Sequence, residues 1–256
     1  MVVIMEVIND LLNYNNLKIV QNTKWFSFSL DSVLLANFVK VKNNIRIIDF
    51  CTGNGPIPLF LSTRINSKII GVEIQKPVYE LAKKSVKINN LDNQIKIIND
   101  DVKNISKMYD TDSFDLITCN PPYFKINEQT KINDNEVKAI ARHELELNLF
   151  EIFKAAKKML KNNGSIAMVH RTDRLVDVIN EMKCNNIEPK RLKFIFPKKN
   201  SNSNMFLIEG RKNGNAGLKV EKPIIVHNND GSYSNEIIKI FNGGNSNEDK
   251  TSSRSW

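Results

Sequence analysis

A short segment after an apolar run combines groups suited to holding a flat molecule. Asn120, Pro121, Pro122 and Tyr123 follow Phe114–Cys119, a run that predicts a buried strand. Each proline fixes its own φ and restricts the residue before it, so the chain leaves the strand in a stiff, extended turn. Open α/β sheets bind their ligands at the carboxyl ends of strands. The amide, the backbone carbonyls and the aromatic ring therefore predict a site for a planar molecule that carries an NH2 group.

A second turn, rich in glycine, predicts a separate ligand contact. Gly53 and Gly55 stand between an apolar run and a helical pattern, where they let a ligand approach the backbone closely. A dinucleotide site expects a third glycine at the position of Pro58, and Asp49 would bring negative charge to the place of a pyrophosphate. The turn therefore favours a ligand with an amine or a sulfonium over a diphosphate.

Two acidic positions follow the next two predicted strands. Glu73 stands about 20 residues after the glycine turn, where an acidic side chain accepts hydrogen bonds from ribose hydroxyls. A lone glutamate at a strand end is otherwise a solvated carboxylate, but its place in this series favours binding. Asp100 and Asp101 come after the third strand. We predict that Asp101 contacts an adenine amino group, because Val102 would then return to the core.

Strand-like and helical patterns alternate from residue 45 onward, which predicts a parallel sheet covered on both faces. Helices are expected near 30–38 (with Ser29 as N-cap), 56–64, 76–90, 148–161 and 172–183. A polar loop between the last two strands indicates a hairpin that makes the far edge antiparallel. The expected strands are Ile45–Phe50, Lys68–Glu73, Gln94–Asn99, Phe114–Cys119, Ser165–His170, Arg191–Phe196 and Met205–Glu209.

In order and spacing, these motifs resemble the class I S-adenosylmethionine-dependent methyltransferases of amino groups. The segment Asn120–Tyr123 is similar to that of enzymes that methylate the exocyclic nitrogen of adenine or the side-chain amide of glutamine. The resemblance covers roughly residues 25–210. It implies a Rossmann-like α/β fold with a mostly parallel seven-stranded sheet, an antiparallel edge strand and helices on both faces. It also implies S-adenosyl-L-methionine as cofactor and no metal.

The resemblance assigns roles residue by residue. Carbonyls of Asn120 and Pro121 would accept the N–H bonds of the acceptor amino group, Pro122 would keep them rigid, and Tyr123 would stack on the base. Together these four are the expected catalytic residues. The expected cofactor-binding residues are Phe28, Asp31, Asp49, Cys51, Gly53, Gly55, Glu73, Ile74, Asp101, Val102 and Asn120.

Three further stretches of the sequence point to one family within this class. Gln21, the segment Phe26–Ala36 and the segment Arg142–Glu144 look like the bacterial tRNA1(Val) adenine-37 N6-methyltransferase family. That family implies N6-methylation of adenine in tRNA, next to the anticodon of one isoacceptor. Any single basic residue is more often a solvated surface charge than an RNA contact. The expected RNA-binding residues are Lys125, Arg142, His143, Lys198 and Lys199.

The composition of the chain indicates its binding partners and its cellular compartment. The 256 residues carry a net charge of +9, which favours a polyanion such as nucleic acid. The alternative interpretation is that a composition rich in lysine and asparagine reflects codon bias in an AT-rich genome. Three cysteines without close spacing indicate reduced thiols in the cytoplasm. No apolar run approaches the roughly 18 residues that span a bilayer. We expect a cytoplasmic monomer with no membrane partner, and no DNA partner, because no segment is long enough for a target-recognition domain.

The sequence predicts three regions along the chain and leaves two alternative functions open. Residues 1–25 form an N-terminal extension, 26–241 the methyltransferase domain, and 242–256 a tail too polar to pack. One alternative is a glutamine N5-methyltransferase of release factors, although such enzymes usually carry a larger helical N-terminal domain. The other is a module that binds S-adenosylmethionine and RNA without catalysis, which the intact Asn120–Tyr123 segment disfavours.

Overall fold

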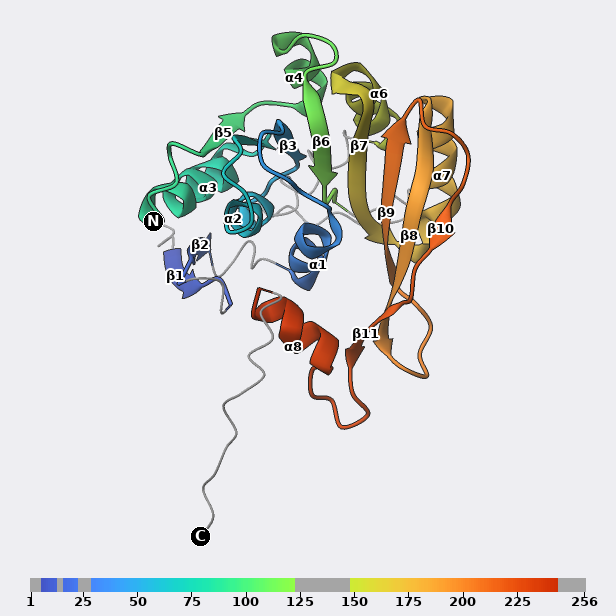
Figure 1. Cartoon of the computed structure of the whole chain (residues 1–256). Helices are drawn as coiled ribbons and strands as arrows, with labels where there is room; N and C mark the ends of the chain where they lie inside the picture. Colours follow the sequence, from blue (N-terminus) through green and yellow to red (C-terminus); the bar gives the residue numbers. More distant parts are fainter. Residues whose placement is uncertain (1–5, 13–15, 23–28, 123–147, 244–256) are drawn as a thin grey trace, which may run out of the picture.

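A mixed sheet of nine strands forms the centre of the molecule (Figure 1). The computed structural model describes residues 6–12, 16–22, 29–122 and 148–243. The strand order is β10-β8-β9-β7-β6-β3-β4-β5, and β11 also pairs with β8. The strands are β3 (Ile47–Phe50), β4 (Ile69–Glu73), β5 (Ile95–Asn99), β6 (Phe114–Cys119), β7 (Leu160–Arg171), β8 (Ile187–Lys198), β9 (Met205–Lys212), β10 (Lys219–Val220) and β11 (Ile224–His227).

Strand direction places many strand ends on one edge of the sheet. β5, β4, β3, β6 and β7 are parallel to one another, while β9 is antiparallel to both β7 and β8. β8 therefore runs in the same direction as β7, and β11 is parallel to β8. The expected mostly parallel, Rossmann-like sheet is confirmed. β10 and β11 extend it beyond the seven predicted strands, and the antiparallel strand β9 lies between β7 and β8.

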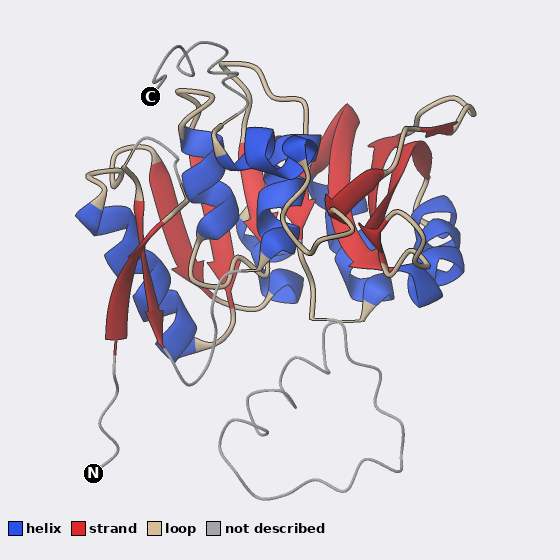
Figure 2. Cartoon of the chain, turned by 90° about the horizontal axis from the view of Figure 1, so that it is seen from below, coloured by secondary structure: helices blue, strands red, loops and turns tan. Residues whose placement is uncertain are grey.

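Helices cover both faces of the sheet (Figure 2). Neighbouring residues of one strand, such as Ile47 and Ile48, belong to different core clusters because side chains alternate across a strand. One cluster contains residues of α1 (Leu30–Phe38), α2 (Pro56–Ser62), α3 (Lys76–Ile88) and α8 (Asn235–Phe241). The other contains residues of α4 (Val102–Met108), α6 (Leu149–Met159) and α7 (Leu175–Cys184), which follows the short 3-10 helix η2 (Thr172–Arg174).

Helix ends follow the capping chemistry of the sequence. Asn148 caps α6, because its side-chain oxygen accepts a bond from the backbone N–H of Glu151 at 3.0 Å. α6 ends at Met159, two residues earlier than predicted, since Leu160 is extended and begins β7 directly. Ser29 is the N-cap of α1, as predicted, but its side chain makes no capping hydrogen bond.

The N-terminal residues form a hairpin that the sequence did not reveal. β1 (Glu6–Asp10) pairs antiparallel with β2 (Lys18–Asn22) in a separate two-stranded sheet. The backbone N–H of Val20 donates to the Ser85 hydroxyl of α3 at 2.9 Å. The Asn54 amide donates to the Val20 carbonyl at 3.0 Å. The hairpin therefore supports the glycine turn, in which Asn54 lies.

Two arginines fix the carboxyl end of α1. The Arg64 guanidinium donates to the backbone carbonyls of Ala36 and Val39. The Arg191 guanidinium lies 4.1 Å from the centre of the Phe38 ring and donates to the Phe38 carbonyl at 3.2 Å. These bonds satisfy carbonyls that the last turn of a helix otherwise leaves without partners. α1 is thereby held rigidly against the sheet.

Candidate active site

The glycine turn adopts a left-handed backbone at both of its glycines and at the residue that follows β3. Cys51, Gly53 and Gly55 have φ values of 56°, 59° and 89°, all in the left-handed region. A side chain at Gly53 would meet no atom within 4 Å, so this part of the backbone is open to a ligand. Gly55 is the N-cap of α2, and Pro56 follows at the first helical position, where proline is favoured.

Asp49 joins the glycine turn to β6. Its carboxylate is fully buried and accepts hydrogen bonds from the hydroxyls of Thr52 and Thr118, each at 2.6 Å. Burial raises the pKa of Asp49 to about 7, although both hydroxyls act in the opposite direction. This geometry suits a residue that positions the turn. A direct contact between Asp49 and the cofactor stays a prediction.

Glu73 fixes the same turn from β4. Its two carboxylate oxygens accept the backbone N–H groups of Gly53 and Gln75, both at 2.9 Å. Carboxylate oxygens accept more than one bond each, so Glu73 can also receive ribose hydroxyls. Ile74 follows with 41% of its surface exposed and offers an apolar contact beside that carboxylate. The Asn99 amide donates to the carbonyls of Glu73 and Ile74 at 2.8 and 2.9 Å.

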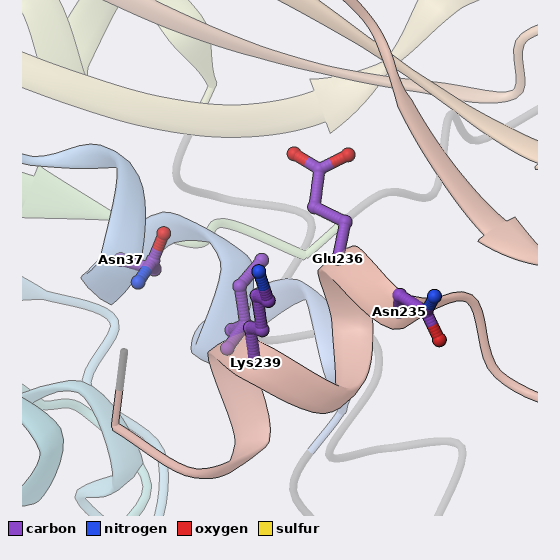
Figure 3. A pocket seen from close by; sticks show the side chains of 5 residues that line it. Asn37, Asn235, Glu236 and Lys239 are labelled. Atoms are coloured by element: carbon purple, nitrogen blue, oxygen red, sulfur yellow. The ribbon is translucent and has the colours of Figure 1, made fainter. Parts of the chain in front are cut away.

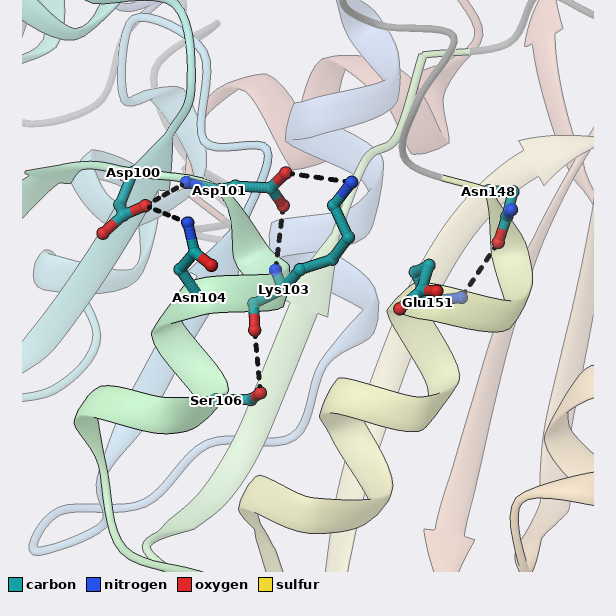
Figure 4. Close-up of polar contacts among 7 residues, drawn as sticks. All are labelled: Asp100, Asp101, Lys103, Asn104, Ser106, Asn148 and Glu151. Carbon is teal, nitrogen blue, oxygen red and sulfur yellow. Dashed lines mark hydrogen bonds and ion pairs between the residues drawn. The ribbon is translucent and has the colours of Figure 1, made fainter.

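The acidic pair after β5 is held at the start of α4 (Figure 4). Asp101 is the N-cap of α4, and its carboxylate accepts the backbone N–H of Lys103 at 2.8 Å. The Lys103 ammonium lies 3.2 Å from the same carboxylate. Asp100 instead accepts the backbone N–H of Asp101 and the Asn104 amide. Val102 is buried, as the choice of Asp101 assumed.

Two thiols lie where β3 and β6 end. Cys119 is buried in β6, paired in register with Phe50, and Cys51 is the next residue after that partner. The pKa of the Cys51 thiol is raised well above its usual value, first by a hydrogen bond with Cys119 and then by burial. A protonated thiol is a poor nucleophile. This geometry therefore favours packing for Cys51 over covalent catalysis.

Asn120 stands at the carboxyl end of β6, beside the glycine turn. Its amide nitrogen donates to the Ser32 hydroxyl of α1 at 3.1 Å. Pro121 is buried and Pro122 half-buried. Thr118 lies two residues before Asn120 and holds Asp49. The predicted acceptor turn and the predicted cofactor turn are thus joined through adjacent strands.

The remaining predicted residues divide into two groups. Asp31 lies half-buried in the first turn of α1, while Lys198 and Lys199 are exposed where β8 ends. β8 is three strands from β6, and Lys198 lies five residues further along its strand than the level of Asn120, so these lysines lie on the order of 20 Å from Asn120. Five predicted site residues lie outside the described residues: Phe28, Tyr123, Lys125, Arg142 and His143.

Several residues that position the site were missed by sequence reasoning: Ser32, Asn54, Thr52, Asn99 and Thr118. Each is a small hydroxyl or amide residue whose partner comes from another element or from across a turn. Such residues carry no local signal, because their role depends on the assembled sheet. Closeness in sequence to the glycine and Asn-Pro-Pro turns could have drawn attention to Thr52, Asn54 and Thr118, whereas Ser32 and Asn99 lie far from both turns in the sequence.

His170, where β7 nears its end, has a structural environment. Its Nδ1 accepts the backbone N–H of Arg171 at 2.9 Å, and its ring stacks on Phe206. Burial, assisted by the charge of Arg174, lowers the pKa of His170 to about 4. The imidazole is therefore neutral near pH 7. This histidine packs against the sheet at the edge that carries Asn120.

A surface pocket lies between α1 and α8 (Figure 3). Its lining includes Asn37, near the carboxyl end of α1, whereas Ser32 near the other end contacts Asn120. The pocket is therefore separate from the strand-end site. Among the described residues, no group of three or more His, Cys, Asp or Glu side chains could hold a metal ion. In the same part of the chain, no helix is long and apolar enough to cross a membrane.

Known proteins resemble this chain in sequence and in fold. A tRNA1(Val) (adenine(37)-N6)-methyltransferase of Bacteroides fragilis is 29% identical over 139 residues, which span 54% of this chain and 57% of that protein. A protein of the same name from Aeromonas hydrophila is 24% identical over 82% of this chain and 86% of its own length. A crystal structure of a predicted O-methyltransferase from Agrobacterium tumefaciens has a TM-score of 0.67 at 17% identity and covers 84% of this chain and 96% of that one.

The structural likeness supports the fold alone, because its identity is low. The match to the Bacteroides relative extends over little more than half of that protein, so its activity does not pass directly to this chain. A family model, methyltransferase small domain, matches residues 17–187. This range includes the glycine turn, both acidic strand ends and Asn120. The chain belongs to the methyltransferase small domain family.

Proposed function

We propose that this protein transfers a methyl group from S-adenosyl-L-methionine to N6 of an adenine in tRNA, at position 37 of tRNA1(Val). The observation that carries the proposal is Asn120, a half-buried amide at the carboxyl end of β6, joined through Thr118 and Asp49 to the open glycine turn. Relatives named for this reaction support the choice of acceptor.

The strand-end residues fit the proposed cofactor. The backbone at Gly53 is open, the Glu73 carboxylate can receive ribose hydroxyls, and Ile74 presents an apolar surface suited to adenine. Asp101 would accept the adenine amino group. When bound, the cofactor supplies an electrophilic methyl group on a sulfonium sulfur. The held carboxylates of Glu73 and Asp101 also favour a positively charged ligand.

The Asn-Pro-Pro turn fits an amino acceptor. The lone pair of an adenine amino group is delocalised into the ring, which makes the nitrogen a poor nucleophile. Carbonyl oxygens of Asn120 and Pro121 would accept its two N–H bonds and offset the positive charge that develops on the nitrogen. The prolines keep these acceptors in place, so little reorganisation is needed. Stacking of the base on Tyr123 stays a prediction.

An RNA substrate fits the charge and the accessible edge. The net charge of +9 favours a polyanion, and the exposed Lys198 and Lys199 lie on the same sheet edge as Asn120. An adenine in a loop turns out of its stack at a cost of a few kcal/mol, less than in a duplex. A cytoplasmic location agrees with this substrate and with three unpaired cysteines.

The direct test uses tRNA from cells that lack this gene. The protein and labelled S-adenosylmethionine are incubated with that tRNA, which is then digested to nucleosides and separated. N6-methyladenosine is the expected product, and sequencing around the modified nucleotide should place it at position 37 of tRNA1(Val). Label on another nucleotide of tRNA would reject the position while retaining the chemistry.

Two alternatives give different results in the same experiment. Asn-Pro-Pro also suits the side-chain amide of glutamine, so release factors are offered as a parallel substrate. N5-methylglutamine without labelled tRNA would identify a protein methyltransferase. Cofactor binding without any methylated product would indicate a module that does not catalyse transfer.

A further inference from the structure

We propose that Ser32 is a positioning residue that sets the orientation of the Asn120 amide. The inference rests on the proposed function, because it concerns how Asn120 presents its carbonyl oxygen to an amino acceptor. Ser32 precedes Asn120 by 88 residues, and nothing in the local sequence connects them. The connection exists only because α1 packs beside the end of β6.

The contact is specific in its chemistry. The Asn120 amide nitrogen donates to the Ser32 hydroxyl oxygen at 3.1 Å, within the range of a good hydrogen bond. Ser32 is only 4% exposed, so water has little access to its side chain. A serine on the buried face of a helix otherwise offers little to packing, and the five residues that flank it in α1 and are also buried are apolar: Val33, Leu34, Leu35, Ala36 and Phe38.

The helix that carries Ser32 is held from its other end. Arg64 and Arg191 bind the backbone carbonyls of its last turn and of the residue after it. Arg191 also pairs with Glu209 and Glu221 at 2.5 and 2.6 Å. These contacts limit movement of α1, so the Ser32 hydroxyl occupies a fixed place. A fixed partner is needed if this hydrogen bond is to hold the amide plane in place.

The planar geometry of an amide links this hydrogen bond to the direction of the Asn120 carbonyl oxygen. The nitrogen and oxygen of Asn120 lie on the same planar group, so fixing the nitrogen toward α1 directs the oxygen to the other side. Rotating the amide by half a turn would exchange the two groups. The acceptor amino group would then meet an NH2 donor in place of a carbonyl acceptor. A serine hydroxyl can donate as well as accept, so Ser32 holds the amide in place through one of its polar atoms. In the arrangement observed that atom is the nitrogen, and the carbonyl oxygen is left pointing away from α1.

The expected effect of Ser32→Ala is modest and selective. Loss of one hydrogen bond should lower the single-turnover rate about 3- to 10-fold, because the productive amide orientation becomes less populated. Affinity for S-adenosylhomocysteine, measured by calorimetry, should stay within about 2-fold. Ser32→Thr keeps the hydroxyl and should recover most of the rate. Ser113→Ala is the matched control, since Ser113 is 6% exposed, makes one hydrogen bond and precedes the other end of β6.

A second readout does not depend on activity. The side-chain amide of Asn120 is followed by 15N NMR and identified by its absence in Asn120→Asp. In the wild-type protein one amide proton should be protected from solvent exchange; Ser32→Ala should remove that protection, while Ser113→Ala should not. An unchanged amide signal together with an unchanged transfer rate in Ser32→Ala would overturn the proposal.

The two proposals fail in different ways. If the wild-type protein methylates no adenine in tRNA, the proposed function is wrong whatever the Ser32 variants do. If the wild-type protein is active and Ser32→Ala is equally active with a protected Asn120 amide, only the role of Ser32 is wrong. Loss of rate in Ser113→Ala to the same degree would also reject the Ser32 role, because the effect would then be a general one on β6.

Discussion

The two halves of the strand-end site differ in how tightly their polar groups are held. In the half formed by β3, β4 and β5, Asp49, Glu73 and Asp101 each accept at least two polar contacts from the protein. In the half formed by β6 and β8, the Asn120 amide donates to the Ser32 hydroxyl of α1 and is half-buried, and Lys198 is exposed. The first half is assembled before any ligand arrives. The second half would present its groups to the proposed RNA substrate.

This difference predicts a separation of effects. Preassembled donors and acceptors bind a ligand without reorganisation, so changes in the β3–β5 half should appear in cofactor affinity and stability. Changes in the β6–β8 half should appear in methyl transfer and RNA affinity. If a change in the β3–β5 half lowered methyl transfer at saturating cofactor, or a change in the β6–β8 half lowered cofactor affinity, the two halves would act as one unit.

The largest effect is expected at the glycine turn. Gly53→Val forces a branched side chain into φ 59°, which costs on the order of 1–3 kcal/mol of stability. The side chain also enters the open space where the cofactor is proposed to lie, so calorimetric affinity should fall at least about 100-fold. Gly231→Val is the control, since Gly231 also has a left-handed φ and open surroundings. Equal cofactor affinity in the two variants would contradict this assignment.

The buried carboxylate predicts a pH dependence. The folded pKa of Asp49, about 7, exceeds its ordinary value of 3.8, so its stabilising contribution is fully present below pH 3.8 and is lost as pH rises through 7. Between pH 5 and 8 the wild-type protein should lose about 2–3 kcal/mol relative to Asp49→Asn. Urea unfolding of both proteins at the two pH values measures this. The titration of His170 affects both proteins equally and cancels in the comparison. If the difference in free energy of unfolding between the two proteins were the same at both pH values, the raised pKa of Asp49 would be refuted.

A smaller effect is expected at Glu73. Glu73→Gln removes the charge from the acceptor of two backbone N–H bonds and should weaken cofactor binding about 10-fold. The single-turnover rate at saturating cofactor should stay within about 3-fold. Glu188→Gln, which loses only an ion pair with Lys183 at the far side of the sheet, serves as control. A large fall in the saturated rate would mean that Glu73 also acts on the acceptor half.

The smallest effect is expected at the lysines that end β8. The double variant Lys198→Ala, Lys199→Ala should weaken tRNA binding a few-fold and reduce the slope of log affinity against log salt by about 1–2. Lys87 and Lys96 are exposed on α3 and β5, and their double alanine variant should change neither quantity. An unchanged salt slope in the β8 variant would remove these lysines from the RNA surface.

The sequence predicted the main sheet because its strands are buried on both faces. Mostly apolar runs such as Phe114–Cys119 have no competing helical period, and β6 begins and ends where predicted. The short helix α4, with Lys103 and Asn104 in its first turn, carries only two buried residues and was missed. β1 was missed for a similar reason: none of its residues is buried, so it shows no strict alternation. β10 has only two residues, too few for any pattern.

The site was predicted in its outline but not in its connections. Glycines and strand-end carboxylates have characteristic spacing, and the structure brings Asp49, Gly53 and Glu73 together as expected. A contact between the Asp49 carboxylate and a ligand stays a prediction, and the sequence did not reveal that two threonine hydroxyls donate to this carboxylate. The bond between Ser32 and Asn120 spans the whole cofactor half of the sequence. Contacts of that kind depend on packing, which local patterns do not report.

The central claim, that the Asn-Pro-Pro turn acts mainly on the acceptor although Asn120 is also expected beside the cofactor, is tested most directly with Asn120→Ala. Single-turnover methyl transfer to tRNA and calorimetric affinity for S-adenosylhomocysteine are measured on the same preparation. The rate should fall at least about 100-fold, as for loss of a group that stabilises developing charge, while cofactor affinity stays within a few-fold. Lost cofactor affinity with a normal single-turnover rate would contradict the account.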